Sequence, residues 1–319
     1  MTGQTASGPP PRLPKWLVYA VAAGLCWGAW GVVSKAMDDA KLSAYQIQLL
    51  FTVGLVLPAG LAAASPRVRD GSRKARGFGW GVAAGFLGGL GNLAFYAALN
   101  QGGKASVVVP LTSLYPLVTL SVAVPFLRER LNRVQAAGIL VSVVAVVLLC
   151  GEAHNLGDPA AAVEGLSGSR WLLSSFVALA FWGLLSVAQK VSTNHVSSEL
   201  SFVGFCAAFV PMAGVTLLAD RTPLEIPWVP AALGVAAGAV NGLGVLASFA
   251  AYRAEGKASV VTPLAGVSQS VFTVALAVAL LGETVRAVEV VGCGVAVLAS
   301  ALLSFESKPA AAGTAGPSP

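Results

Sequence analysis

Neutral polar and aromatic side chains recur at helical spacing inside long apolar segments of this sequence. In segment 229–252, for example, Asn241, Ser248 and Tyr252 fall within about 40° of one direction at about 100° per residue. Such a face on a membrane helix can line a solvated cavity that binds a small polar solute. The same groups can instead bond one helix to the next, which contributes about 0.6 kcal/mol on average. For any single residue both interpretations stay open.

Six of the apolar segments carry such a face, three in each half of the chain. The candidate cavity residues are Trp27, Ser34, Asn92, Tyr96, Thr112, Tyr115, Trp182, Ser186, Gln189, Asn241, Ser248, Tyr252, Thr262 and Gln269. Because these faces occur at matching places in the two halves, the pattern as a whole favours a cavity over scattered contacts between helices.

Acidic side chains are absent from the middle of every apolar segment. Glu129 and Glu283 stand at segment ends, so the sequence disfavours a relay of protons or cations through a mid-membrane carboxylate. His154 and His195 lie near loops, and no zinc-protease, serine-hydrolase or phosphate-loop motif occurs. The four cysteines have no metal-like or redox-like spacing. We therefore expect no enzymatic activity, no metal and no cofactor.

The composition indicates that these segments lie in a bilayer. Charged residues make up 11% of the chain, against about 25% in soluble domains, and the mean hydropathy is +0.76. A soluble chain of this composition would expose more apolar surface than such proteins show. The net charge of +6 comes from basic residues in short loops, which favours a role in membrane orientation over binding of nucleic acid.

Ten segments are apolar and long enough to be transmembrane helices, since a span takes roughly 20 residues. Such runs must be helical because the hydrocarbon offers no partner to an exposed backbone. They cover residues 16–36, 45–64, 78–100, 106–127, 134–150, 171–191, 200–218, 229–252, 259–281 and 285–305. Pro116 lies deep in the fourth segment, where we expect it to bend the helix.

The two halves of the chain, 15–150 and 171–307, are copies of each other. Residues 89–111 align without gaps on residues 242–264, and 15 of those 23 positions are identical. Farther along, the offset between the two aligned halves changes by one residue, and the match then continues, with Glu129 paired with Glu283. We call this change of offset the one-residue slip. Each half therefore provides five helices.

An odd number of spans in each half means that the second copy enters the membrane from the opposite side. On this topology, 14 of the 20 basic residues lie on the side of the N-terminus, which predicts cytoplasmic termini and a plasma-membrane location. Residues 1–14 and 308–319 are then disordered cytoplasmic tails, and residues 151–170 an external linker. The expected fold class is an all-α integral membrane protein of ten transmembrane helices, arranged as two inverted-topology five-helix repeats.

Several repeated motifs resemble the drug/metabolite transporter superfamily, with two EamA-like halves. These are the early Trp-Gly pairs at Trp27 and Trp182, the GKASVV-x-PL joints, and the Leu-x-Glu endings at Glu129 and Glu283. The resemblance implies ten helices, cytoplasmic termini and a central cavity lined by the first, third, fourth, sixth, eighth and ninth helices. It also implies a diverse range of substrates that includes sugars, amino acids, nucleotide sugars and drugs.

The expected function is transport of a small polar metabolite, a sugar, amino acid or similar compound, by alternating access around a midplane cavity. The alternative is a non-transporting membrane receptor or scaffold. Its partners would be the bilayer and a small-molecule substrate, with a homodimer left open. Two pairs of lysines related by the repeat, Lys35 with Lys190 and Lys104 with Lys257, are candidate gate residues at the two mouths. Snorkelling to lipid headgroups would also account for them.

Overall fold

The computed structural model describes residues 13–127, 132–150, 169–219, 225–303 and 305. Within these residues the chain is helical, and one isolated backbone bridge joins Gly71 to Val196 in two loops. The helices of the first half are α1 (Lys15–Asp39), α2 (Ala44–Gly54), α3 (Val56–Ala64), the short 3-10 helix η1 (Pro66–Arg69), α4 (Lys74–Asn100), α5 (Ala105–Thr112), α6 (Pro116–Leu127) and α7 (Arg133–Cys150). Those of the second half are α9 (Arg170–Thr193), α10 (Ser198–Ala219), α11 (Trp228–Arg253), α12 (Ala258–Leu281) and α13 (Ala287–Leu303).

Eight stretches of the described residues are long and apolar enough to cross a membrane. They are 15–39, 44–64, 74–100, 105–122, 170–193, 198–218, 228–253 and 260–281, and two shorter apolar helices run through Arg133–Ala145 and Val290–Leu303. The chain is therefore an all-helical membrane protein. Residues 1–12 of the predicted N-terminal tail, the predicted tail at 308–319, most of the predicted linker, and Glu129 lie outside the described residues.

Two of the predicted segments are interrupted, and a proline explains each interruption. Pro58 lacks the N–H that would bond to Gly54, and α2 gives way to α3 at Leu55. Pro116 likewise leaves the Thr112 carbonyl without its usual donor four residues on. That carbonyl accepts instead from Tyr115 N at 3.0 Å, a tighter turn that separates α5 from α6. The bend expected at Pro116 is confirmed.

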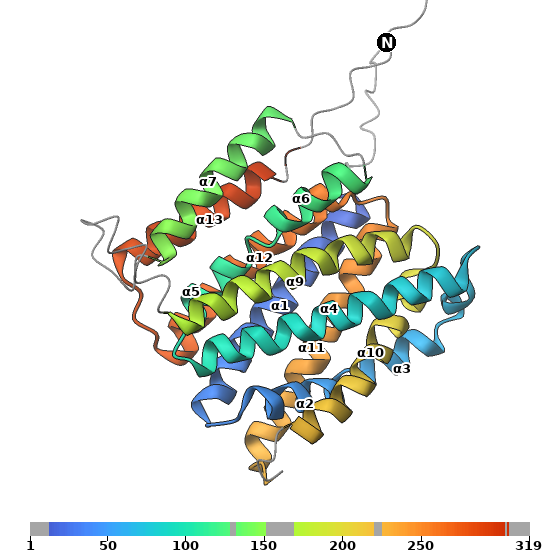
Figure 1. Ribbon diagram of the computed structural model, residues 1–319, viewed down its shortest axis with the longest axis horizontal. Helices are drawn as coiled ribbons and strands as arrows, with labels where there is room; N and C mark the ends of the chain where they lie inside the picture. Colours follow the sequence, from blue (N-terminus) through green and yellow to red (C-terminus); the bar gives the residue numbers. More distant parts are fainter. Residues whose placement is uncertain (1–12, 128–131, 151–168, 220–224, 304, 306–319) are drawn as a thin grey trace, which may run out of the picture.

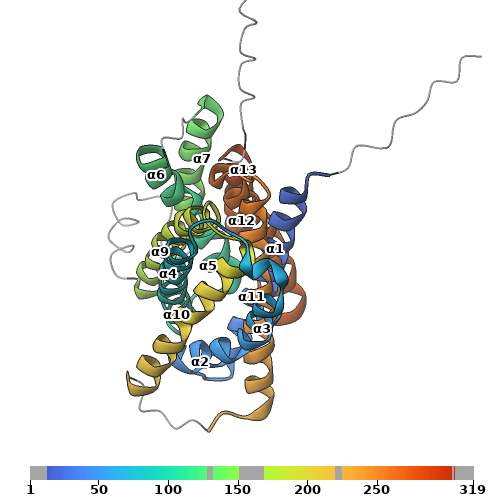
Figure 2. The same ribbon diagram turned by 90° about the vertical axis from the view of Figure 1, so that its right-hand side faces the viewer.

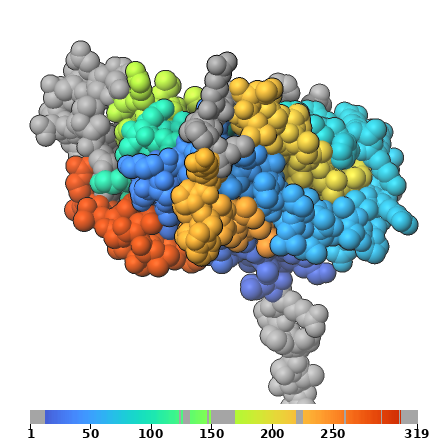
Figure 3. Space-filling view, turned by 90° about the horizontal axis from the view of Figure 1, so that it is seen from below, coloured from blue at the N-terminus to red at the C-terminus, as the bar shows by residue number. Residues whose placement is uncertain are grey.

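The first helix of each half packs mainly against the other half. α1 lies along α11 and α12, whereas α9 lies along α4 and α6. We call the first set, α1, α11 and α12, the α1 group, and the second set, α9, α4, α5 and α6, the α9 group. Figure 2 shows α9 and α4 on one side of the molecule and α1, α11 and α12 on the other. In Figure 3 the start of α11 lies among residues of the first half, consistent with its contacts to α1 and α2.

The remaining helices flank these two groups at opposite edges. α7 packs against α13 at one edge, and α2, α3 and α10 cover the other (Figure 1). Between the groups lies an aromatic cluster, in which Trp30 stacks on Phe95 at 4.9 Å and meets Trp182 edge-on at 5.8 Å between ring centroids. This cluster joins α1, α4 and α9 at the level of the cavity described below.

Contacts near the helix ends fix the directions of the helices. Ser192, near the end of α9, donates to the carbonyl of Gly77 near the start of α4, at 2.7 Å. Ser174, near the start of α9, donates to Gln101 just beyond the end of α4, at 3.0 Å. α4 and α9 are therefore antiparallel, and Asn100 at the end of α4 bonds to Asp38 at the end of α1. α1 thus ends where α9 begins. We call that end of the molecule the Lys35 end and the opposite one the Lys190 end.

Candidate functional site

A small cavity lies between the α1 group and the α9 group. Its volume is about 40 Å³, which is room for only a few water molecules. The lining residues are Trp27, Trp30, Gly88, Asn92, Tyr115, Trp182, Leu185, Ser186, Gln189, Phe205, Asn241, Val245 and Gln269. None of these described lining residues carries a charge, and most of their polar groups are amides or indoles.

The tryptophan of each Trp-Gly pair packs directly against a glycine of the other half. A Cβ on Gly244 would lie 2.9 Å from the Trp27 indole nitrogen, and a Cβ on Gly91 would overlap the Trp182 ring. Gly91 and Gly244 are equivalent positions of the repeat. The absence of a side chain at both lets each indole approach the opposite helix closely.

Two threonine hydroxyls donate to the backbone carbonyls of the glycines in the same Trp-Gly pairs. Thr273 Oγ1 donates to the carbonyl of Gly28 at 3.2 Å, and Thr119 Oγ1 donates to the carbonyl of Gly183 at 3.1 Å. These matching contacts pair Thr119 with Thr273, as the alignment does after its one-residue slip. The slip therefore falls before residue 119, in the stretch that contains the break between α5 and α6.

The same register pairs Tyr115 with Gln269, and both residues line the cavity. Their backbone carbonyls lie close to Gly183 and Gly28 respectively, where an added Cβ would come within 2.8 and 3.0 Å. Tyr115 lies in the break between α5 and α6, directly before α6, whereas Gln269 lies within the continuous helix α12. The scaffold is thus nearly symmetric, but the chemistry on its two sides differs.

Four amide side chains give the cavity its polarity. Asn92, Asn241 and Gln269 are 5%, 5% and 3% exposed, and within the described part of the chain no hydrogen bond joins their side chains to another residue. The Oε1 atom of Gln189 accepts from Ser248 Oγ at 3.2 Å, whereas its buried Nε2 has no partner among the described residues. Buried polar groups normally find a partner, so these amides are suited to bind a solute.

The structure brings eight of the fourteen candidate residues to the cavity. They are Trp27, Asn92, Tyr115, Trp182, Ser186, Gln189, Asn241 and Gln269. The other six lie nearby and bond within the protein. Ser34 and Thr112 donate to carbonyls of their own helices, at 2.8 Å each. Tyr96 accepts from Trp30 Nε1 at 3.2 Å, Ser248 donates to Gln189, and the hydroxyls of Tyr252 and Thr262 bond to each other at 2.7 Å.

Five lining residues were not anticipated from the sequence. Trp30 and Leu185 each follow a tryptophan of a Trp-Gly pair by three residues, which is a spacing that shares a helix face. Gly88 and Val245 are the repeat counterparts of Asn241 and Asn92, so symmetry could have identified them. Phe205 comes from α10, and no spacing in the sequence indicates it.

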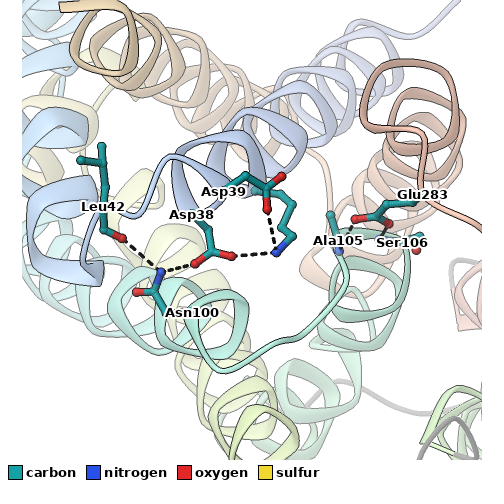
Figure 4. A network of polar contacts seen from close by, with 8 residues as sticks. Asp38, Asp39, Leu42, Asn100, Ala105, Ser106 and Glu283 are labelled. Atoms are coloured by element: carbon teal, nitrogen blue, oxygen red, sulfur yellow. Dashed lines mark hydrogen bonds and ion pairs between the residues drawn. The ribbon is translucent and has the colours of Figure 1, made fainter. Parts of the chain in front are cut away.

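At the Lys35 end, polar contacts join the two helix groups (Figure 4). The Lys35 amine bonds to Asp38 at 2.7 Å and to Asp39 at 3.3 Å. The Asn100 amide donates to the same Asp38 carboxylate and, at 3.2 Å, to the carbonyl of Leu42. The Lys35 contacts lie within α1, whereas the Asn100 bonds link the end of α1 and the loop after it to the end of α4.

The carboxylate of Glu283 provides a second link at this end. It follows Gly282, whose left-handed conformation ends α12. Its two oxygens accept from the backbone N–H groups of Ala105 and Ser106, at 3.1 and 3.0 Å. An acidic group at a helix start satisfies donors that have no partner within the helix, so Glu283 ties α12 to the start of α5.

At the Lys190 end, different groups join the same two sets of helices. The Lys190 amine donates to the carbonyl of Gly256 at 3.0 Å and to that of Tyr252 at 3.4 Å. Arg253 donates to the carbonyl of Thr193 at 3.3 Å. The other two gate candidates, Lys104 and Lys257, are the residues immediately before α5 and α12.

Comparison with known families assigns the chain. The family model described as the EamA-like transporter family matches it twice, over residues 14–151 and 169–305. The chain belongs to the EamA-like transporter family. The two matches correspond to the halves predicted from the internal repeat, and the family consists of membrane transporters, so this EamA protein is not expected to be an enzyme.

Relatives in sequence and in structure give less detail. A stretch of 60 residues is 42% identical to an uncharacterized protein of Methanocaldococcus jannaschii. That match covers 19% of this EamA chain and 43% of the archaeal protein. A crystal structure of a protein of similar length superposes with a TM-score of 0.62 over 90% of this chain and 95% of its own, at 20% identity. At that level of identity the likeness shows the fold alone.

Proposed function

We propose that this EamA protein carries a small polar solute across the plasma membrane by alternating access. The observation that carries the proposal is the cavity lined by four buried amides between two helix groups, with a separate set of bonds joining the groups at each end. A transporter of this kind needs a central site and two gates that open in turn. The alternative receptor or scaffold would need the site but not two gates.

Helix directions and basic residues support an inverted arrangement of the two halves in the membrane. α1 ends at the Lys35 end and α9 ends at the Lys190 end, so the first helices of the two halves point in opposite directions. With ten spans, the Lys190 end would face the cytoplasm, because 14 of the 20 basic residues then lie on that side. Both termini would be cytoplasmic.

The size of the cavity indicates which conformation this is. A volume of about 40 Å³ does not hold a sugar or an amino acid, since sites for small molecules are several times larger. Contacts join the two helix groups at both ends of the molecule, so we assign this conformation to the closed step of the cycle. Solute would enter after the helix groups separate at one end, and it would leave after they separate at the other.

The four lysines fit the same mechanism as parts of the two gates. Lys190 already bonds to carbonyls at the end of α11, and Lys35 bonds to carboxylates at the end of α1. Lys104 and Lys257 stand at the equivalent helix starts. We propose that Lys35 and Lys104 belong to the external gate and that Lys190 and Lys257 belong to the cytoplasmic gate.

The test is transport by the purified protein in liposomes. Pools of radiolabelled sugars and amino acids are offered, and saturable uptake of one pool is the expected result. Trp182→Phe should lower that uptake by about tenfold because the indole forms part of the cavity wall, with the yield of folded protein unchanged. Trp80→Phe is the control, since Trp80 is 39% exposed and lies outside the cavity lining. Absence of saturable uptake from every pool would favour the receptor or scaffold.

A further inference from the structure

The polar groups of the described cavity lining are neutral. Within the described lining there is no carboxylate, ammonium, guanidinium or imidazole. A charged solute group moved from water into this buried site would lose its hydration without gaining a counter-charge, which is unfavourable. The lining therefore disfavours ions and also zwitterions, which carry two such groups.

Helix ends could replace side-chain charges, but they do not reach this cavity with free donors. α1, α4, α9 and α11 run without interruption past the residues that they contribute. The break between α5 and α6 does lie at the cavity, beside Tyr115. Its N–H groups are already used, since Leu114 N bonds to Leu111 O at 3.2 Å and Tyr115 N bonds to Thr112 O at 3.0 Å. Pro116 has no N–H, so the start of α6 offers little to a carboxylate.

Gln189 is the cavity amide whose available hydrogen-bonding group is best defined. The side chain is 1% exposed, and Ser248 occupies its Oε1 atom. Gln189 lines the cavity from α9, and its buried Nε2 atom has no partner among the described residues. A buried donor left unpaired costs free energy, so a solute that presents an oxygen acceptor here gains an interaction that no protein group supplies.

We propose that the cavity selects an uncharged solute rich in hydroxyl groups, a sugar or polyol, and that the Gln189 amide recognises one of its oxygens. This inference rests on the proposed function, because it names the substrate class of the same site. Hydroxyl groups both donate and accept, so they match the amides of Asn92, Asn241 and Gln269, which also do both. Trp27 and Trp182 also line the cavity, and indole rings can contact the C–H groups of such a solute.

A quaternary ammonium compound is the strongest competing ligand, because aromatic rings also bind such cations. It has no hydrogen-bonding group on its cationic centre, however, and would leave the amides of Asn92, Asn241 and Gln269 and the Nε2 atom of Gln189 without a partner. The number and burial of these amides therefore favour the hydroxyl-rich solute.

The experiment measures both binding and flux for three sets of radiolabelled solutes. The first set is glycerol, D-xylose and D-glucose, the second is L-serine and L-threonine, and the third is choline and glycine betaine. Binding is measured on the purified full chain in nanodiscs, and flux on the same protein in liposomes. We expect saturable binding and flux for at least one member of the first set and for none of the other two.

Substitutions at Gln189 separate recognition from folding. Gln189→Leu should weaken binding of the uncharged solute by about tenfold, since one buried hydrogen bond is lost. Gln189→Glu should weaken it at least as much, because the carboxylate removes the donor and adds a charge. Gln48→Leu is the matched control. Gln48 is also a buried glutamine whose amide atoms lack partners among the described residues, but it lies in α2 and does not line the cavity. Its substitution should leave binding unchanged.

Each outcome decides a different question. Saturable flux of an amino acid or of a quaternary ammonium compound, without flux of the first set, would overturn the inference and keep the proposed transport function. Binding of a sugar or polyol that depends on Gln189, without flux of any solute, would overturn transport and keep the assignment of the ligand. Binding of a sugar or polyol that is the same in Gln189→Leu and the wild type would remove Gln189 from the site. Absence of binding and flux in all three sets would overturn both.

Discussion

Individual residues in this protein show how similar side chains at similar spacings take different roles. Ser34 and Gln189 are equivalent in the repeat, yet only Gln189 lines the cavity. A serine hydroxyl in a helix can donate to the carbonyl four residues earlier, as Ser34 does to Trp30 at 2.8 Å. A longer amide extends beyond its own helix. Side-chain length separates these two equivalent residues, but it is not a general rule, because Ser186 lines the cavity while its hydroxyl donates to the Trp182 carbonyl of its own helix at 3.0 Å.

This contrast also shows how far the site can be predicted from sequence. Helical spacing and repeat symmetry identify the faces that contain Asn92, Asn241 and Gln269. They do not distinguish a hydroxyl bonded to its own helix, such as that of Thr112, from a group open to the cavity. That distinction depends on side-chain rotamers and on neighbours from other helices, which the pattern of one sequence does not contain.

Gly91 provides a test at the scale of one residue. A methyl group at this position would overlap the Trp182 ring, so Gly91→Ala should displace the ring and lower transport at least severalfold. Gly79→Ala is the control, because Gly79 lies in the same helix with no atom near its added Cβ. That change should leave transport unchanged and should stabilise α4 slightly, by about 0.5–1 kcal/mol. Flux and thermal unfolding of both variants check the prediction, which equal flux in Gly91→Ala and wild type would contradict.

At the scale of helices, the two halves differ at the cavity in the fourth helix of each repeat. The first half breaks this helix into α5 and α6, whereas the second half keeps it whole as α12. A proline inside a helix was visible in the sequence, and so was the bend expected at Pro116. The structural effect of the one-residue slip could not be predicted. An alignment shows that the numbering of the two halves shifts by one residue, but it does not show where in the structure this shift occurs. The threonine contacts to Gly28 and Gly183 supply that position.

Glu283 provides a test at this scale, because it connects α12 to the start of α5. Glu283→Gln keeps the shape of the side chain but removes its charge and one of its two acceptors. Loss of such a contact to a helix start costs about 1 kcal/mol, so the Lys35 end should open about fivefold more often. A cysteine at Ser186, in a background without the four native cysteines, reports the opening through its rate of modification by an impermeant thiol reagent. An unchanged rate from the external side would show that Glu283 does not hold this gate.

At the scale of the whole molecule, the two helix groups are assembled across the halves. The repeat predicts ten helices of matched type but says nothing about which helix packs against which. In the structure the first helix of each half packs mainly against the other half: α1 packs along α11 and α12, and α9 packs along α4 and α6. This exchange arises from contacts between distant residues, such as the Trp27 ring on Gly244. Hydrophobic periodicity along one chain cannot specify such pairing.

The orientation of the molecule can be checked with single cysteines in two exposed loops. Arg69 lies before α4 at the Lys190 end, and Gln101 follows α4 at the Lys35 end. An impermeant thiol reagent should label Gln101→Cys from outside intact cells and Arg69→Cys only after the membrane is opened. The reason is the positive-inside rule, which places the loop with Arg67, Arg69 and Arg73 in the cytoplasm. Labelling of both positions from the same side would contradict a spanning α4.

The two ends of the molecule should have opposite effects on the transport cycle. Asn100 and Arg253 are equivalent in the repeat. Asn100 joins α4 to α1 through Asp38 and Leu42 at the Lys35 end, and Arg253 joins α11 to α9 through Thr193 at the Lys190 end. Both sets of bonds are present in one closed conformation. Removing either set should therefore favour opening at that end only.

Asn100→Ala should raise the modification rate of a cysteine at Ser186 from the external side, and Arg253→Ala should raise it from the cytoplasmic side. The expected change is severalfold in each case, since each loss removes one or two hydrogen bonds of roughly 1 kcal/mol. Inside-out and right-side-out vesicles distinguish the two directions. Lys35→Gln and Lys190→Gln should reproduce the two effects if the amines act through the same gates. A rise from the same side in both Asn100→Ala and Arg253→Ala would mean that the two ends do not open in turn, whereas unchanged rates with wild-type flux would leave these residues as structural links alone.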